Sequence, residues 1–160
     1  MFFDISLRNL TTLKDIEFPP SVTTLNCSHN QLTTLEGCPP SVTTLNCSHN
    51  QLTTLEGCPP NVTTLYCHYN QLTTLEGYLP NVTYLCCSYN QLTTLKRCPP
   101  SVVTLYCYGN PLIDLYKDKS ILEIHNINRI KALKKGISLI NNLLSALKYK
   151  DVGGNGGIMN

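Results

Sequence analysis

The sequence has no long run of apolar residues, and its first residues do not resemble an export signal. No stretch approaches the about 18 consecutive apolar residues that a membrane-spanning helix needs. Residues 1–10 carry Asp4 and Arg8 and lack the apolar run and small-residue cleavage site of a signal peptide. We therefore expect no transmembrane segment and an intracellular, cytoplasmic location. If the source were a virus or a pathogen, that location would be the host cytoplasm.

The cysteines lack the features of a disulfide scaffold or a zinc site. The chain has nine cysteines, which is an odd number, and no two of them form a C-x-x-C pair. Zinc sites usually pair their ligands at such short spacings. We therefore expect reduced cysteines that pack as small apolar residues, with no bound metal and no cofactor.

A repeat of twenty residues dominates the chain. SVTTLNCSHNQLTTLEGCPP occupies residues 21–40 and returns unchanged at 41–60, related copies follow at 61–80 and 81–100, and 101–115 is a shortened copy. Residues 1–20 share the apolar spacing and are interpreted as a degenerate first unit. A fixed period of this length predicts a solenoid, residues 1–115, in which each unit depends on its neighbours for stability.

Each unit is expected to form one coil with a short strand. Residues 24–28 alternate between polar and apolar side chains, which predicts a half-buried strand. Pro39 and Pro40 remove backbone donors and force an extended stretch, so the chain returns on the opposite side without a helix. Stacked coils then bury leucines such as Leu25 and Leu45 in one file.

The motif Val22-x-x-Leu25-x-Cys27-x-x-Asn30-x-Leu32 resembles the leucine-rich-repeat pattern L-x-x-L-x-L-x-x-N-x-L, in five successive copies over residues 21–115. The short period and the proline-ended turn are similar to repeats of secreted bacterial effectors and of proteins from large DNA viruses, with some likeness to FNIP repeats. The resemblance implies a leucine-rich-repeat solenoid with a curved parallel β-sheet on its concave side, an irregular or extended convex side and an asparagine ladder. It implies no single partner, because this architecture hosts many functions.

Two columns of the repeat are assigned to structure. The asparagine column is expected to turn inward and hydrogen-bond loop backbone groups; it consists of Asn30, Asn50, Asn70, Asn90 and Asn110. Two cysteine files are expected to pack in the interior rather than hold a metal, and they consist of Cys27, Cys47, Cys67, Cys87 and Cys107, and of Cys38, Cys58 and Cys98.

The outward strand positions form the candidate partner-binding surface. They change from small polar and histidine side chains in the first units to a tyrosine-rich half in the later units, and tyrosine provides rigid contact area with a polar tip. The alternative interpretation is that the tyrosines only cover neighbouring strand backbone. The predicted partner-binding residues are Thr24, Asn26, Ser28, His29, Asn46, Ser48, His49, Thr64, Tyr66, His68, Tyr69, Tyr84, Cys86, Tyr89, Tyr106 and Tyr108.

These features predict a protein–protein interaction module for an unknown protein ligand, with no catalysis and no small-molecule substrate. The three strand-end histidines recur because the repeat recurs, and a shallow row offers no pocket that joins a nucleophile, a base and an orienting group. Two alternatives stay open: a substrate-recognition adaptor of a ubiquitin-ligase system, and a repeat array with only a structural role. Effectors of this resemblance that carry a ligase domain use a catalytic cysteine, and residues 116–160 contain none.

Residues 116–150 are expected to form a helical C-terminal cap. Ser120 and Glu123 have the spacing of a capping box, which predicts a helix start near Ile121, and Gly136 predicts a break between two amphipathic helices. Residues 116–151 hold eight of the twelve Lys and Arg, but the basic residues are few and do not share one helical face, so nucleic acid is a disfavoured partner. The second apolar stripe would suit a partner helix or a second copy, giving a homodimer. Residues 151–160 are expected to be a flexible Gly-rich tail.

Overall fold

The structure is a computed structural model that describes residues 1–77, 79–112, 116 and 119–152, with residues 145–152 described by their backbone alone. The chain divides into two compact units, Met1–Ile124 and His125–Asn160. Most of the predicted Gly-rich tail, residues 153–160, lies outside the described residues. Within the described part of the chain, no helix combines the length and the apolarity that a membrane span requires.

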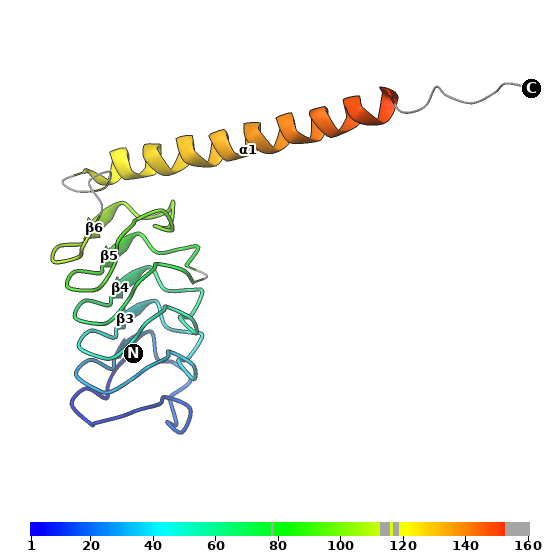
Figure 1. Cartoon of the computed structure of the whole chain (residues 1–160). Coiled ribbons are helices and arrows are strands. Elements are labelled where there is room, and N and C mark those ends of the chain that lie inside the picture. The colour runs from blue at the N-terminus through cyan, green and yellow to red at the C-terminus, as the bar shows by residue number, and fades with distance from the viewer. Residues whose placement is uncertain (78, 113–115, 117–118, 153–160) are drawn as a thin grey trace, which may run out of the picture. The chain divides into compact units, whose positions relative to one another are not determined.

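The first unit is a solenoid of stacked coils, each of which contributes one short strand to a single parallel sheet (Figure 1). The sheet follows chain order, and its strands are β1 Phe2–Asp4, β2 Thr24–Asn26, β3 Thr44–Asn46, β4 Thr64–Tyr66, β5 Tyr84–Cys86 and β6 Thr104–Tyr106. From β2 onward the register pairs each residue with its equivalent in the next repeat, as in Leu25 with Leu45. The fixed period therefore sets the pairing, and the predicted solenoid with a parallel sheet is confirmed.

The core of the solenoid consists of the leucine, valine and cysteine files of the repeat. The central leucines of the strands have no exposed surface from Leu25 to Leu85, whereas Leu105 in β6, the last strand, is partly exposed. The connection from the first strand to the second is longer than the later connections. Phe3 pairs with Leu25, whereas each residue of β2 to β5 pairs with the residue twenty positions further along the chain. Burial thus depends on having a coil on both sides, as expected for a solenoid.

The asparagine column turns inward after each strand, as predicted. Asn50 Nδ2 donates to the carbonyl oxygens of Cys27 and Cys47, both at 3.1 Å, while Asn50 Oδ1 accepts from the Leu32 amide at 2.9 Å. The same bonds recur at Asn70 and Asn90. Each asparagine therefore links two coils by satisfying backbone groups that the sheet does not pair.

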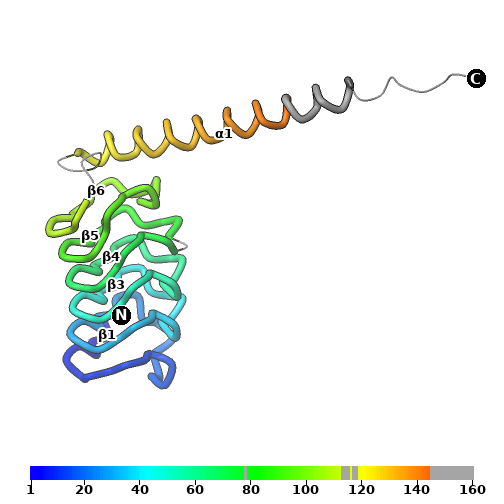
Figure 2. The backbone as a smooth tube through the Cα atoms, viewed as in Figure 1, coloured from blue at the N-terminus to red at the C-terminus, as the bar shows by residue number. Residues whose placement is uncertain are grey.

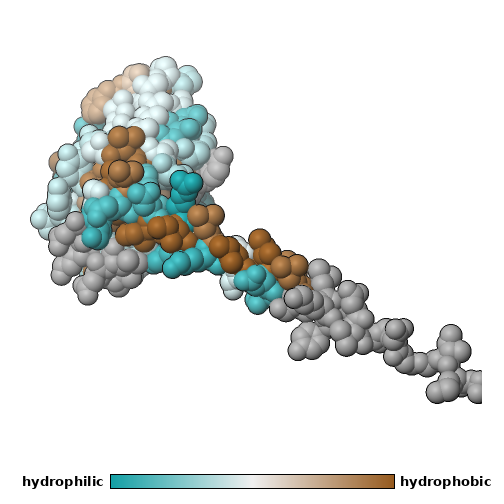
Figure 3. Space-filling model, turned by 90° about the horizontal axis from the view of Figure 1, so that it is seen from above, coloured by the Kyte–Doolittle hydropathy of each residue, from teal (hydrophilic) through white to brown (hydrophobic). Residues whose placement is uncertain are grey.

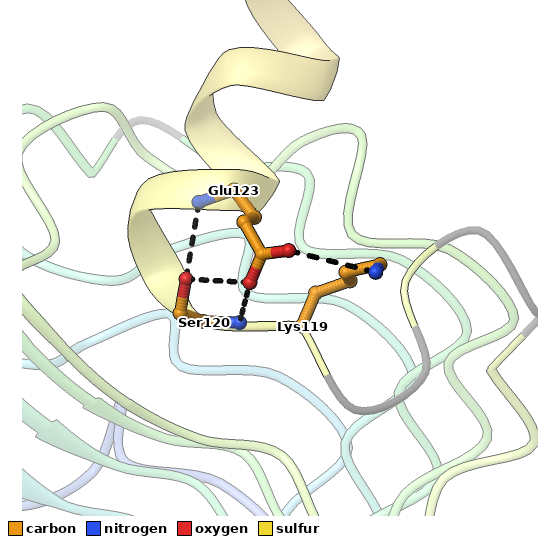
Figure 4. A network of polar contacts seen from close by, with 3 residues as sticks. All are labelled: Lys119, Ser120 and Glu123. Atoms are coloured by element: carbon orange, nitrogen blue, oxygen red, sulfur yellow. Dashed lines mark hydrogen bonds and ion pairs between the residues drawn. The ribbon is translucent and has the colours of Figure 1, made fainter.

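A single helix, α1 Ile121–Val152, follows the solenoid (Figure 2). Its start is fixed by the predicted capping box: the Ser120 amide and hydroxyl donate to Glu123 Oε2 at 2.9 and 2.8 Å, and the Glu123 amide donates back to Ser120 Oγ at 3.3 Å (Figure 4). Lys119 Nζ lies 3.5 Å from Glu123 Oε1. The side chains of Tyr116 and Ile124 are each 1% exposed, so the first helical turn shares the buried interior of the first unit.

The predicted break at Gly136 is wrong. The helix runs through this residue and continues to Val152, so the first two residues of the expected tail are also helical. A glycine in a helix interior costs about 1 kcal/mol relative to alanine, which lowers helix stability without ending the helix. Ala132, Leu133, Lys134 and Lys135 precede Gly136 and are strong helix formers.

Candidate functional site on the concave face

The outward side chains of the six strands form one continuous face, which we call the concave face. In β2 to β5 the central residue is buried and its two neighbours are partly exposed, so the residues that flank each leucine point outward. Apart from Asp4 in β1, these outward strand residues carry no ionised side chain. The face is therefore suited to a partner that is recognised by apolar contact and neutral hydrogen bonds rather than by charge.

The predicted outward position two residues after each strand does not lie at the surface in three coils. Ser28, Ser48 and Ser88 are 5%, 2% and 5% exposed. The Ser28 hydroxyl donates to Asn26 Oδ1 at 2.8 Å, and the Ser48 hydroxyl donates to Asn46 Oδ1 at 2.7 Å. The strand alternation ends at the third strand residue, so the expectation that Ser28 and Ser48 face outward is wrong. His68 and Tyr108, at the same position of other coils, are accessible.

A ladder of stacked rings runs along the strand ends. The ring centroids of His29 and His49 are 4.1 Å apart, those of His49 and Tyr69 are 4.5 Å apart, and those of Tyr69 and Tyr89 are 4.5 Å apart, with interplanar angles of 17° or less. Parallel strands about 4.8 Å apart bring equivalent side chains to stacking distance. The ladder ends at Gly109, where an added Cβ would lie 2.5 Å from Tyr89 Cδ1.

The four ladder residues share a left-handed backbone, with φ between 52° and 54°. This conformation costs roughly 1–2 kcal/mol for residues other than glycine. It turns the chain out of the strand so that the following asparagine points into the solenoid. The side-chain pattern indicates this turn only weakly: histidine is enriched at positive φ, but a bulky residue such as tyrosine is rarely found there.

A second group of tyrosines lies over β4, β5 and β6. The Tyr66 and Tyr84 ring centroids are 5.3 Å apart, those of Tyr84 and Tyr106 are 5.6 Å apart, and those of Tyr106 and Tyr108 are 6.0 Å apart. Tyr106 and Tyr108 are 37% and 66% exposed. Three of the four line the aromatic hollow, a depression of about 290 Å³ bounded by His68, Tyr69, Tyr84, Cys86, Ser88, Tyr89, Tyr106 and Tyr108.

The floor of the aromatic hollow differs chemically from the same position in the earlier coils. Within the described residues, the Ser88 hydroxyl is buried without a hydrogen-bond partner. In β2 and β3 an asparagine accepts the equivalent serine hydroxyl, but in β5 that asparagine is replaced by Cys86. The Cys86 thiol instead lies 3.7 Å from His68 Nδ1. A buried donor is therefore left without an acceptor beneath the floor of the hollow.

Two histidines of the concave face, His49 and His68, have lowered pKa values. Partial burial, followed by the nearby His29, lowers the pKa of His49. Burial also lowers the pKa of His68, with smaller effects of His49 and His29. Near pH 7 these imidazoles offer one donor and one acceptor each and add no charge to the face.

A second hollow of about 250 Å³ lies at the other end of the concave face, among Phe2, Asn26, Asn46 and Tyr66. Two larger hollows, of about 360 and 400 Å³, lie on the convex turns and are lined by turn residues such as Glu76, Gly77 and Arg97. The concave hollows are the better candidates for contact, because convergent aromatic side chains line them and supply rigid contact area.

Four of the five cysteines of the first file are packed in the interior, as predicted, and Cys107 in the last coil is partly exposed. Cys27, Cys47, Cys67 and Cys87 have no exposed surface, and all nine cysteines are free thiols. Burial raises the pKa of Cys27 to about 12 and raises that of Cys47, Cys67 and Cys87 well above the ordinary value. No group of three potential metal ligands occurs among the described residues. These thiols therefore act as small apolar side chains.

Comparison with known proteins adds a family match to this geometry. A family model described as Leucine Rich repeats (2 copies) matches residues 40–80. No curated protein matches the chain, and no solved structure matches it. The family match and the stacked parallel sheet support a leucine-rich-repeat protein, and repeats of this family generally mediate protein–protein interactions. The fold is a leucine-rich-repeat solenoid followed by one C-terminal helix.

Proposed function

We propose that this chain is a non-catalytic module that binds a protein partner on its concave face, with the main contact at the aromatic hollow over β4 to β6. The observation that carries the proposal is the gathering of Tyr84, Tyr106 and Tyr108 around one hollow of the concave face. Tyrosine contributes large contact area at low entropic cost, and it is enriched among the residues that dominate binding energy.

The partner is proposed to present an apolar or aromatic group. The aromatic hollow would receive this group between its tyrosine side chains. Because the outward residues around the hollow are neutral, ionic strength should have little effect on this contact.

The first part of the concave face is proposed to have a smaller role. Its first two complete coils carry identical residues, and Asn26 and Asn46 already use their Oδ1 atoms to hold Ser28 and Ser48. Of the remaining predicted contacts, His29 and His49 belong to the ring ladder, and Thr24 and Thr64 are the first residues of β2 and β4. They would extend a contact centred on β4 to β6.

An intracellular site of action is proposed on the basis of the thiols. A chain with nine free cysteines, several of them stacked in neighbouring coils, keeps its fold most readily where thiols stay reduced. Dimerisation through α1 is a separate hypothesis, which the lipid experiment below also tests.

The test is partner capture from cell lysate by the purified chain and by a variant with Tyr66→Ser, Tyr84→Ser, Tyr106→Ser and Tyr108→Ser. A control with Glu36→Ser and Glu56→Ser changes exposed side chains on the convex turns instead. We expect the wild type and the control to enrich the same protein and the tyrosine variant to lose it while its circular dichroism spectrum is unchanged. Equal capture by the folded tyrosine variant would remove the proposal.

A further inference from the structure

The described part of α1 carries an apolar surface that is unlike anything on the solenoid. Between residues 130 and 144 of this helix, seven large apolar side chains are each more than half exposed: Ile130, Leu133, Ile137, Leu139, Ile140, Leu143 and Leu144. Figure 3 shows apolar side chains gathered along one side of the helix, with hydrophilic ones beside them. A contiguous exposed apolar surface of this kind indicates an interaction site.

Continuity of the helix through Gly136 is what aligns these side chains. At about 100° per residue, the apolar residues of 130–144 all fall within an arc of about 180°, and the polar ones fall within the remaining arc. The polar arc contains Lys131, Lys134 and Lys135 together with Ser138, Asn141 and Asn142. A break at Gly136 would have left the two halves without a fixed rotation, so the shared face follows only from the continuous helix.

Between its first turn and its last two residues, this helix carries charge of one sign. Residues 124–150 contain six Lys and Arg and no Asp or Glu. Such a helix has no internal acid–base pairs at i, i+4, and it attracts a negatively charged surface. Over residues 130–144, an apolar face beside a polar face that holds three lysines is the combination found in helices that lie in the interface of an anionic membrane.

We propose that α1 binds the surface of an anionic lipid membrane, with its apolar arc in the acyl region and its lysines at the lipid headgroups. A lipid surface covers the whole apolar arc, including Leu139 and Leu143. Lys134 and Lys135 extend from the edges of the polar arc toward phosphate and carboxylate groups. The helix then places the solenoid, with its concave face, at a membrane surface.

A second copy of the helix fits this surface less well. A two-helix seam uses two positions in every seven, so it covers the row from Ile130 to Leu144 but leaves Leu139 and Leu143 in water. It would also bring together basic helices that have no acidic residue between 124 and 150 for pairing across the seam. Nucleic acid matches the charge but leaves the apolar arc exposed.

The experiment is co-sedimentation of the full chain with vesicles of phosphatidylcholine alone and with vesicles that also contain phosphatidylserine. We expect binding to the phosphatidylserine vesicles and little binding to the others. Lys134→Gln with Lys135→Gln should weaken binding about 30-fold, because the double variant loses about one interaction with an anionic headgroup for each lysine. Ile137→Asn should weaken it at least about tenfold through the lost apolar contact.

Matched controls on the solenoid separate the helix from general effects. Lys96→Gln with Arg97→Gln removes the same charge from a convex turn, and Val103→Asn removes an exposed apolar side chain outside α1. Both controls should bind the vesicles like the wild type. Circular dichroism should show unchanged helix content in every variant, because isoleucine and asparagine have similar helix propensities.

Four results would overturn the proposal: no binding to either kind of vesicle, equal binding to both, binding that Ile137→Asn leaves unchanged, or equal weakening by the control variants. Sedimentation of the chain in the absence of lipid distinguishes the competing occupant. A stable dimer that Ile137→Asn dissociates, combined with no vesicle binding, would assign the apolar arc to a second copy. Failure of this proposal would leave the concave-face proposal intact, since the two rest on different units of the chain.

Discussion

Most leucine side chains of the solenoid are buried, whereas the described ones on helix α1 are exposed. Leu65 in β4 has no exposed surface, whereas Leu139 in α1 is 55% exposed. In the solenoid each coil is too small to bury its own leucines, but a neighbour on either side covers them. The described part of the helix has no such repeat of itself beside it, so its apolar face is left for another surface. Apolar spacing alone therefore does not determine burial, because the partner of each apolar face must also be counted.

The largest expected difference between the two regions comes from shortening a leucine. Leu65→Ala should lower the free energy of unfolding by about 3 kcal/mol, because it leaves a cavity between two stacked coils. Leu139→Ala should change it by less than about 0.5 kcal/mol. Urea unfolding followed by circular dichroism measures both. Equal losses for the two variants would mean that α1 buries its apolar face within the chain.

The asparagines allow a second comparison of the same kind. Asn70 Nδ2 donates to the carbonyl oxygens of Cys47 and Cys67 at 3.1 and 3.2 Å, and its Oδ1 accepts from the Leu52 amide at 3.0 Å. Asn70→Leu leaves these buried backbone groups without hydrogen-bond partners. It should lower the free energy of unfolding, measured with urea, by about 2–3 kcal/mol. Asn142→Leu, on the exposed polar arc of α1, should be close to neutral. A small effect at Asn70 would show that water replaces its bonds.

Replacing a glycine with alanine should change stability in opposite directions in the two regions. Gly109→Ala is expected to destabilise the solenoid by about 1 kcal/mol or more, because φ is 64° there and the new Cβ would contact the Tyr89 ring. Gly136→Ala, with no atom within 4 Å of an added Cβ, should stabilise α1 by up to about 1 kcal/mol. Thermal unfolding of each variant checks the signs, and stabilisation by Gly109→Ala would contradict the ladder geometry.

Two equivalent serines of the solenoid should differ because only one is paired. Ser48→Ala removes the 2.7 Å hydrogen bond to Asn46 Oδ1 and should lower the free energy of unfolding by about 1 kcal/mol. Ser88→Ala removes an unpaired hydroxyl and should leave the free energy of unfolding almost unchanged. Cys86→Asn restores the acceptor and should stabilise the chain by about 1 kcal/mol. If Ser88→Ala proves as costly as Ser48→Ala, the Ser88 hydroxyl is paired in solution.

The smallest predicted effect is a dependence of solenoid stability on pH. The pKa values of His49 and His68 are lowered in the folded state, so the unfolded chain binds more protons as the pH falls through the ordinary histidine range. The contribution of these residues is complete above the ordinary histidine pKa of about 6.5 and is lost as the pH falls toward their folded pKa values. Urea midpoints should therefore decrease on acidification, and the decrease should be smaller in a variant with His49→Gln and His68→Gln. If the urea midpoint of the double variant decreases as much as that of the wild type, groups other than His49 and His68 cause the decrease.

The features that depend on the repeat itself could be predicted from the sequence. The file from Leu25 to Leu85, the inward asparagines and the parallel register follow from a period of twenty residues, because equivalent positions must stack. The capping box at Ser120 was also predictable, because two side chains and two amides suffice to make it.

Features that depend on departures from the repeat were harder to predict. The burial of Ser28 accompanies a turn at His29 with φ of 54°, which the side-chain pattern indicates only weakly, because tyrosine occupies the same position in later coils. The lack of an acceptor for the Ser88 hydroxyl can be recognised only when Cys86 is compared with the asparagines that accept the equivalent hydroxyls in other coils. The helix passes through Gly136 because one glycine costs less than its helix-forming neighbours contribute.

Photo-crosslinking can decide whether the concave face over β4 to β6 contacts a protein partner. A photoreactive phenylalanine derivative is placed at Tyr106, beside the aromatic hollow, or at Glu56 on a convex turn. We expect a discrete crosslinked protein from position 106 and none from position 56. Crosslinking of a partner from position 56 alone would contradict the proposed binding surface.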